Sequence, residues 1–263
     1  DVHDRIVFSK DICDKKIVDE DMKAIRKQLN KIIKHKTDFD GKVFYDLSIN
    51  YTDRKIRDFF YKMEALNEWE NTNLAIISDH GTVNLEWPER NYKNHPKEKK
   101  IGFFDFYDEL HHVPVIFYGK DITPKEDHRL VSSIDIAPTL LDMSGIPIPE
   151  SYKGKSLLNP DFERDYVIME HLGPGPCDFN EKNVNICVRS KKKKVVCEFD
   201  LENNLKIREC YDLVTDPLEL NDLSEKPLSN EFNQLIQVAK KRLIEIRKHQ
   251  NISSDELPTQ KEE

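Results

Sequence analysis

Residues 74–81 have the sequence Leu-Ala-Ile-Ile-Ser-Asp-His-Gly, in which a short apolar run ends abruptly in polar residues. A continuous apolar run of this length is typical of a buried parallel strand. In open α/β sheets, ligands bind beyond the carboxyl ends of the strands. Asp79 and His80 at that position offer one oxygen and one nitrogen donor to a divalent cation, and Gly81 lets the backbone turn closely behind them. The alternative is that Asp79 caps the following turn and that His80 is incidental.

Helical and strand patterns alternate on either side of this stretch. Apolar residues at helical spacing predict helices over residues 19–36, 43–66, 103–110 and 134–143, the last capped by Ser133. A short apolar run predicts a strand over residues 113–118. Strands that alternate with helices are typical of a parallel α/β sheet. We therefore expect an α/β domain over residues 1–150.

The pattern changes after Pro149. Four short alternating segments predict an antiparallel sheet, with strands over residues 166–169, 184–189, 194–199 and 205–211. An amphipathic helix over residues 228–249 closes this part. The expected second domain therefore spans residues 151–250, and residues 251–263 form a polar tail.

Composition excludes several classes of protein. The 263 residues include 41 basic and 49 acidic side chains, so the net charge of −8 argues against affinity for nucleic acid that comes from phosphate contacts. No run approaches the ~18 to 20 apolar residues of a membrane span. The first residues lack the basic start and apolar stretch of a signal peptide. An odd number of cysteines, five, excludes a complete set of internal disulfides. These features favour a cytoplasmic location, with export open if a further segment precedes Asp1.

Five blocks in the sequence, taken in order along the chain, form a set. The block at residues 133–146, Ser-Ile-Asp-Ile-Ala-Pro-Thr-Leu-Leu-Asp-Met-Ser-Gly-Ile, is continued by residues 152–158, and the block at residues 210–223 begins with Cys210-Tyr-Asp-Leu. The other blocks are residues 45–56, 106–119 and 175–178. Together they resemble the sulfatases of the alkaline phosphatase superfamily: the block at residues 133–146 is very close to a helix of that family, and residues 210–223 resemble its distinctive C-terminal ending. The resemblance implies that residues 1–150 are the C-terminal part of a sulfatase-like catalytic α/β domain with a parallel sheet. It also implies that residues 151–250 are the smaller antiparallel sheet with its C-terminal helix.

The resemblance further implies metal-dependent hydrolysis of an anionic sulfuric ester. In that family a cysteine or serine, converted to formylglycine, attacks the ester while held on a divalent cation, and the cation neutralises charge on the transferring group. Asp79 and His80 match the later pair of metal ligands. Calcium is the expected ion, with manganese and zinc as alternatives.

Two parts of the family pattern are missing from this sequence. It contains no Cys/Ser-x-Pro-x-Arg nucleophile motif, so no formylglycine nucleophile is expected, and no apolar strand ending in Asp-Asp precedes Asp79. The chain therefore corresponds to about the C-terminal half of a family member, and we expect it to be inactive alone. An N-terminal half or a second chain is the expected partner. Two alternatives stay open: a phosphoesterase or phosphonate monoester hydrolase of the same superfamily, which His80 allows, and a truncated, non-catalytic binding relative.

Two further residues are carried over from the family. His3 stands in an opening that weakly resembles the loop whose histidine contacts the ester, although a mobile terminal histidine is the simpler interpretation. The basic group that faces the sulfate aligns nearest to Gly102 and Phe103, which cannot serve, so Lys100 or its neighbour Lys99, and less easily His95, is the candidate after a small shift of the loop. The alternative is that residues 97–100 form a solvated loop. The run Lys191–Lys194 is predicted to be an exposed hairpin turn that could also attract an anionic substrate.

Overall fold

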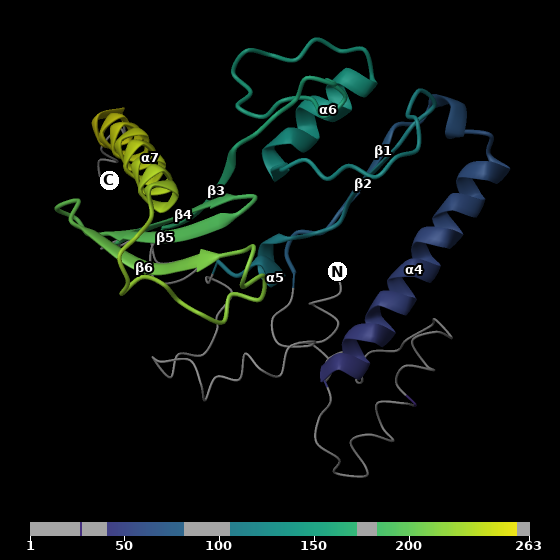
Figure 1. Ribbon diagram of the computed structural model, residues 1–263. Helices are drawn as coiled ribbons and strands as arrows, with labels where there is room; N and C mark the ends of the chain where they lie inside the picture. The colour runs from purple at the N-terminus through teal and green to yellow at the C-terminus, as the bar shows by residue number, and fades with distance from the viewer. Residues whose placement is uncertain (1–26, 28–40, 82–105, 173–182, 257–263) are drawn as a thin grey trace, which may run out of the picture. The chain divides into compact units, whose positions relative to one another are not determined.

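The computed structural model describes residues 27, 41–81, 106–172 and 183–256. The chain divides into two compact units: the first contains residues up to Ile101 together with His112–Ile122, and the second contains Gly102–His111 and Thr123 onward (Figure 1). Each unit has its own secondary structure and is described separately below. The predicted helix over residues 19–36 lies outside the described residues except for residue 27, which is helical.

The first unit is built around a long helix and two short strands. Helix α4 (Gly41–Ala65) is followed by a 3₁₀ turn, η1 (Trp69–Asn71), and then by strands β1 (Leu74–Ile77) and β2 (Val115–Tyr118). The Trp69 ring contacts Phe60 of α4 edge-on at a centroid distance of 5.0 Å and Tyr118 of β2 at 4.7 Å. Edge-to-face aromatic pairs each add about 0.5–1.5 kcal/mol beyond the area that they bury. Trp69 therefore joins the helix to the strand pair that carries Asp79 and His80.

The pairing of these two strands differs from the sequence prediction. Strands β1 and β2 are antiparallel, with Leu74 opposite Tyr118 and Ile77 opposite Val115, whereas the alternation of elements predicted a parallel pair. A parallel pair needs a crossover, usually a helix that packs back on the same sheet. Residues 102–111, where the sequence predicted that helix, belong to the second unit instead. The short helix there, α5 (Asp108–His111), therefore cannot serve as the crossover.

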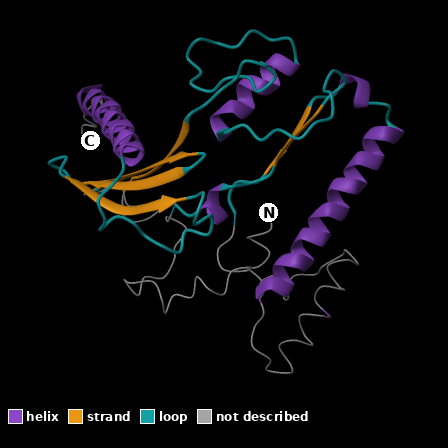
Figure 2. Ribbon diagram, in the orientation of Figure 1, coloured by secondary structure: helices purple, strands orange, loops and turns teal. Residues whose placement is uncertain are grey.

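The second unit contains the predicted antiparallel sheet and its closing helix. Strands β3 (Tyr166–Leu172), β4 (Val184–Ser190), β5 (Lys193–Phe199) and β6 (Leu205–Asp212) pair in sequence order, and every pair is antiparallel (Figure 2). Helix α7 (Asn230–Glu256) follows them. The fold class, a mixed α/β chain with an antiparallel sheet and a C-terminal helix, is confirmed.

The two faces of this sheet have different cores. Side chains alternate between faces along a strand, so β4 sends Val184, Ile186 and Val188 toward α7, where they share a buried cluster with Phe232 and Ala239. The neighbouring positions on the opposite face form a second cluster, in which Cys187 and Val196 pack against Phe106. Residues 106–111 therefore cover the face that α7 leaves open.

The similar blocks at residues 133–146 and 152–158 are joined by one buried carboxylate. Asp135 ends the 3₁₀ turn η3 (Ser133–Asp135), which leads into helix α6 (Ile136–Met143) and is capped at Ser132, one residue before the predicted cap. The Asp135 carboxylate accepts hydrogen bonds from the Ser132 N–H at 2.9 Å, the Lys155 N–H at 2.9 Å and Arg164 at 2.6 Å. Gly154 is required beside it, because a Cβ there would lie 1.9 Å from the carbonyl oxygen of Ile134.

Three cysteines of the second unit are buried and unpaired. Cys187, Cys197 and Cys210 are buried free thiols, and burial raises the pKa of both Cys197 and Cys210 to about 12. They pack as small apolar side chains. Cys13 and Cys177 lie outside the described residues. Within the described part of the chain, no helix combines the length and the hydropathy of a membrane span.

Candidate metal site and a buried charge network

Asp79 and His80 follow directly after β1, and local hydrogen bonds fix both side chains. The His80 N–H donates to Asp79 Oδ1 at 2.9 Å, and Ser78 Oγ donates to the His80 carbonyl oxygen at 2.9 Å. His80 Nδ1 lies 2.7 Å from the carbonyl oxygen of Gly81. A carbonyl only accepts hydrogen bonds, so Nδ1 is the donor in this contact. The residues that terminate the strand thus also select the histidine tautomer.

The second carboxylate oxygen faces this imidazole. Asp79 Oδ2 lies 3.7 Å from His80 Nε2, and the two side chains are 63% and 33% exposed, respectively. Slight burial opposes ionisation of Asp79, but the hydrogen bond from the His80 N–H and the nearby imidazole lower its pKa below the usual value. The carboxylate is therefore ionised at neutral pH and stands at the solvent-accessible end of the strand.

This donor pair fits a divalent ion. Metal–ligand distances are about 2.0–2.2 Å for zinc and about 2.3–2.6 Å for calcium, so one ion can contact two atoms that lie 3.7 Å apart. Metal-bound histidines usually donate their other ring N–H to a carbonyl or carboxylate, as the contact of His80 with Gly81 allows. In the described residues no third histidine, cysteine, aspartate or glutamate completes a metal-binding group. The other two predicted site residues, His3 and Lys100, lie outside the described residues.

A second charged group, which the sequence did not predict, is buried in the other unit. Lys194 of β5 is fully buried and donates to the Phe106 carbonyl oxygen at 2.7 Å, to Asp108 Oδ1 at 2.6 Å and to Glu219. Arg189 of β4 donates to Asp108 Oδ2 at 2.9 Å. These four charged residues, Asp108, Arg189, Lys194 and Glu219, are called the buried charge network below. The prediction of an exposed turn over Lys191–Lys194 is therefore wrong for Lys194.

A capped loop brings Glu219 to this network. The Asp216 carboxylate accepts hydrogen bonds from the backbone N–H groups of Leu220 at 3.0 Å and Asn221 at 2.8 Å, which closes the loop after β6. Glu219 takes a left-handed backbone conformation with φ of 56°, and its Oε2 accepts the Asp108 N–H at 2.9 Å. The similar blocks at residues 106–119 and 210–223 meet here. The distinctive C-terminal ending therefore supports the segment that covers the sheet.

Burial and attraction act in opposite directions on Asp108. Burial raises its pKa, but the Lys194 charge and the hydrogen bonds from Arg189 and Lys194 outweigh it and bring the pKa to about 2. The sequence contained a signal for this arrangement. Lys194 stands two residues before Val196, so within a strand the two side chains point to the same face of the sheet. In the register of the sheet Arg189 lies opposite Lys194, so the two cations stand side by side on one face.

Two family profiles match this chain. The profile "Sulfatase" matches residues 43–146, which include Asp79 and His80, and the profile "N-sulphoglucosamine sulphohydrolase, C-terminal" matches residues 100–249, more than half of the 263 residues. The chain belongs to the sulfatase family. All four residues of the buried charge network lie within the second match. The family resemblance read from the five sequence blocks is thus confirmed.

Similar sulfatases are longer than this chain. Arylsulfatase K of Homo sapiens is 26% identical over 193 residues, covering 70% of this chain and 34% of its own length. Choline-sulfatase of Rhizobium meliloti (strain 1021) is 27% identical over 191 residues, covering 70% of this chain and 33% of its own length. The chain thus spans about a third of the length of these curated relatives.

One solved structure resembles this chain in its fold. It was determined in complex with its substrate, D-glucosamine-2-N,6-O-disulfate, and aligns with a TM-score of 0.51 at 19% identity. The alignment covers 92% of this chain and 48% of the other. At this identity the likeness concerns the fold alone.

Proposed function

We propose that this chain is the C-terminal part of a metal-dependent sulfuric ester hydrolase, in which Asp79 and His80 supply two ligands to the cation. The observation that carries the proposal is the orientation of His80: Nδ1 is held by the Gly81 carbonyl, and Nε2 faces Asp79 Oδ2 at 3.7 Å. This pair follows β1 within the segment that matches the sulfatase profile. The cation, when bound, would polarise a sulfate oxygen and hold the attacking group.

The chain's own residues would divide the remaining tasks. Asp79 and His80 would hold the ion, Lys100 would neutralise charge on the sulfate, and His3 would contact the ester oxygen. The last two roles come from the family resemblance and stay predictions. The nucleophile would come from outside this sequence, which contains no Cys/Ser-x-Pro-x-Arg motif. We therefore expect no turnover of an aryl sulfate by the 263-residue chain.

A sulfate ester is the proposed substrate because the relatives are named arylsulfatase and choline-sulfatase. Calcium is the ion expected from the resemblance, but the imidazole donor suits manganese or zinc better than calcium, which prefers oxygen ligands. Two ligands alone bind a divalent ion weakly, so we expect millimolar affinity in the isolated chain.

The structure offers a matched control for a metal titration. His128 Nε2 also lies 3.7 Å from a carboxylate oxygen, that of Glu126, but these side chains are 86% and 91% exposed. Among the described residues, this pair follows no strand, and no backbone carbonyl orients its ring. The described part of the chain thus offers one held and one unsupported example of a histidine beside an acid.

The experiment follows the histidine ring resonances by NMR while Mn²⁺ is added. We expect the His80 resonances to broaden at several-fold lower Mn²⁺ than those of His128, and Asp79→Asn to remove the difference. Glu126→Gln should leave the broadening of His80 unchanged. Equal broadening of both rings, or no effect of Asp79→Asn, would contradict the proposed ligand pair. Turnover of an aryl sulfate by this chain, abolished by Asp79→Ala, would contradict its inactivity alone.

A further inference from the structure

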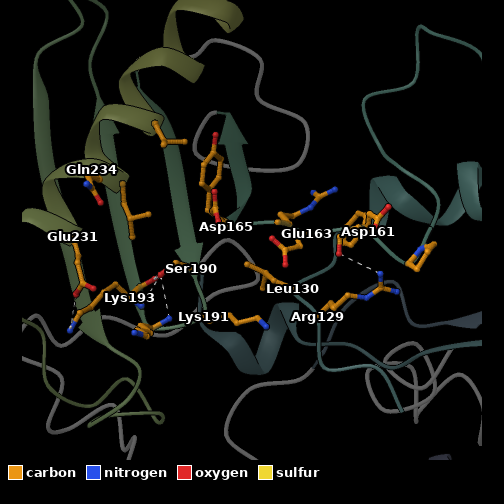
Figure 3. A pocket seen from close by; sticks show the side chains of 17 residues that line it. Arg129, Leu130, Asp161, Glu163, Asp165, Ser190, Lys191, Lys193, Glu231 and Gln234 are labelled. Atoms are coloured by element: carbon orange, nitrogen blue, oxygen red, sulfur yellow. Dashed lines mark hydrogen bonds and ion pairs between the residues drawn. The ribbon is translucent and has the colours of Figure 1, made fainter. Parts of the chain in front are cut away.

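A groove of about 880 Å³ lies within the second unit, beside the turn of the β4–β5 hairpin (Figure 3). One wall is that turn, residues 190–193, with the first turns of α7 beside it, and the other wall is the segment 160–166. The volume is near the upper end of the range of about 300–1,000 Å³ that is usual for small-ligand pockets. Neither Asp79 nor His80 lines the groove, and the proposed function assigns no role to it.

Inward-facing side chains hold the segment 160–166 at alternate residues. Phe162 is 2% exposed, and the Arg164 guanidinium lies 5.4 Å from the centre of its ring. Arg164 also donates to the buried Asp135 at 2.6 Å. The residues on either side of these anchors are exposed acids whose carboxylates form no ion pair among the described residues. They are called the acidic wall below and consist of Asp161, Glu163 and Asp165.

The acidic wall has the spacing of an extended chain. Burial alternates with a period of two along residues 161–165. In an extended chain, side chains two residues apart point to the same side and lie roughly 6.5 Å apart. Basic side chains at every second position of an extended peptide have this same spacing and would face the three carboxylates in register. A compact ligand would reach fewer of them.

The backbone of this wall is also unpaired. The ladder between β3 and β4 begins with Tyr166 opposite Ser190, where β4 ends. Residues 163–165 precede this ladder, and their backbone N–H and C=O groups form no hydrogen bond with another described residue. Unpaired backbone next to an edge strand is a template for the addition of a further strand. This observation is independent of the charges and favours a peptide over a ligand without backbone amides.

The hairpin wall carries charges of the opposite sign. Lys191 and Lys192, called the lysine pair below, are exposed, and no ion pair involves them among the described residues. Ser190 Oγ fixes the turn by accepting the Lys193 N–H at 3.0 Å. In Figure 3 the Lys191 side chain extends from the hairpin toward Glu163. Opposite charges thus border one groove, yet the described structure contains no ion pair between its two walls.

We propose that this groove binds an extended segment of another protein in which basic and acidic residues alternate. Successive side chains of such a segment point to opposite sides, so its basic residues would face the acidic wall and its acidic residues the lysine pair. Cross-strand pairs of opposite charge are stabilising. A uniformly basic segment would be repelled by the lysine pair, and a uniformly acidic one by the acidic wall.

The remaining contacts of the segment follow from the same arrangement. Its backbone would pair with residues 163–165, which have no other partner among the described residues. Tyr166 and Leu130 line the groove and would contact the aliphatic stems of its long charged side chains. The wall is already held by Phe162 and Arg164, so binding would order only the incoming segment.

The test compares two peptides by fluorescence anisotropy with the full chain at low ionic strength. One peptide is Lys-Glu repeated four times, and the other, of the same composition and net charge, is Lys-Lys-Glu-Glu repeated twice. In an extended conformation only the first places all lysines on one side and all glutamates on the other. We expect it to bind about five-fold more tightly than the second. High salt should remove the difference.

Variants assign the two walls. Neutralising the acidic wall by Asp161→Asn, Glu163→Gln and Asp165→Asn together should reduce the affinity for the alternating peptide to that for the blocked peptide. Neutralising the lysine pair should act in the same direction but more weakly, because two charges are removed instead of three. The matched control neutralises three exposed acids outside the groove and should keep the full preference: Asp53→Asn, Glu64→Gln and Glu225→Gln.

N-methylated peptides test the backbone pairing. In an added strand the N–H groups of alternate residues point toward the neighbouring strand. Methylating either the lysine amides or the glutamate amides of the alternating peptide should therefore abolish binding, and the other pattern should leave most of it. Equal effects of the two patterns overturn the proposal, as does equal binding of the two unmethylated peptides or an equal loss in the control variant. No readout depends on metal or turnover, so failure here is distinct from failure of the proposed function.

Discussion

The two units place acids beside bases in opposite surroundings. In the first unit, Asp79 and His80 are 63% and 33% exposed, and Asp79 Oδ2 lies 3.7 Å from His80 Nε2, too far for a hydrogen bond. In the second unit, Lys194 is 1% exposed and lies 2.6 Å from Asp108, whose side chain is 23% exposed. Similar chemical groups therefore serve different purposes. The Asp79–His80 pair is open to solvent, whereas the ammonium group of Lys194 contacts protein groups in place of water.

The donors of Lys194 show why the buried network is structural. An ammonium group has three donors, and the groups that they reach are the Phe106 carbonyl, Asp108 and Glu219. No donor is left for a substrate. The network instead holds residues 106–108 on the face of the sheet opposite α7. Because Lys194 is buried and all of its donors are paired, we interpret it as a structural residue and not as part of a binding site.

The largest expected effect is that of removing the buried cation. Lys194→Met leaves Asp108 and Glu219 without their shared partner, and breaking a buried pair in this way costs about 3–5 kcal/mol. We expect the free energy of unfolding of the second unit to fall by that amount, as measured by urea unfolding followed by circular dichroism. Lys192→Met, at an exposed neighbour, should change it by less than about 0.5 kcal/mol. Equal effects of the two variants would mean that the network contributes little.

The pH dependence of the second unit should be the next largest effect. The pKa of Asp108 is about 2, below the usual 3.8, so its contribution is present above the unfolded value and is lost as the pH falls from about 4 to about 2. A shift of this size corresponds to roughly 2 kcal/mol. Urea unfolding at pH 5 and pH 2.5 should show the loss. In Asp108→Asn that part of the pH dependence should be absent, and an unchanged profile in this variant would contradict the assignment.

Local sequence patterns predicted the elements more accurately than their pairing. The strand over residues 74–77 is observed with the predicted bounds, because a four-residue apolar run between polar neighbours has few alternatives. The strand predicted over residues 113–118 begins at Val115, after Pro114, which has no backbone N–H for the ladder. The antiparallel pairing of these strands depends on where residues 102–111 pack, and no local pattern contains that information.

The same distinction applies to the two charged groups. Asp79 and His80 are adjacent in sequence, so one motif identified both. The buried charge network joins partners that are far apart in sequence: the Lys194 contact with Phe106 spans 88 residues and that of Arg189 with Asp108 spans 81. A run of lysines before a strand gives no sign of such partners. The alternation of side chains along β5 could have placed Lys194 on the same face as Val196, but the prediction of an exposed turn did not use it, and it does not identify the groups that neutralise the Lys194 charge.

The smallest expected effect concerns the exposed pair. In metal-free buffer, Asp79→Asn should change the stability of the first unit by less than about 0.5 kcal/mol, because substitutions at exposed sites rarely do more. With Mn²⁺ at ten times its dissociation constant, the unsubstituted chain should gain about 1.4 kcal/mol, since an ion that binds only the folded state stabilises by RT ln(1 + [L]/Kd). Hydrogen exchange of the β1–β2 amides reports this gain for the first unit alone.

The variant should not gain this stability at the same Mn²⁺ concentration, and exchange in β4 and β5 should stay unchanged in both proteins. Protection of β4 and β5 by the ion would place the binding site in the second unit. A metal-independent loss of several kcal/mol in Asp79→Asn would show that the Asp79 carboxylate is a structural support like that of Asp108. Either result would remove the contrast between the two units, because it rests on one acid–base pair being open to a ligand and the other being closed.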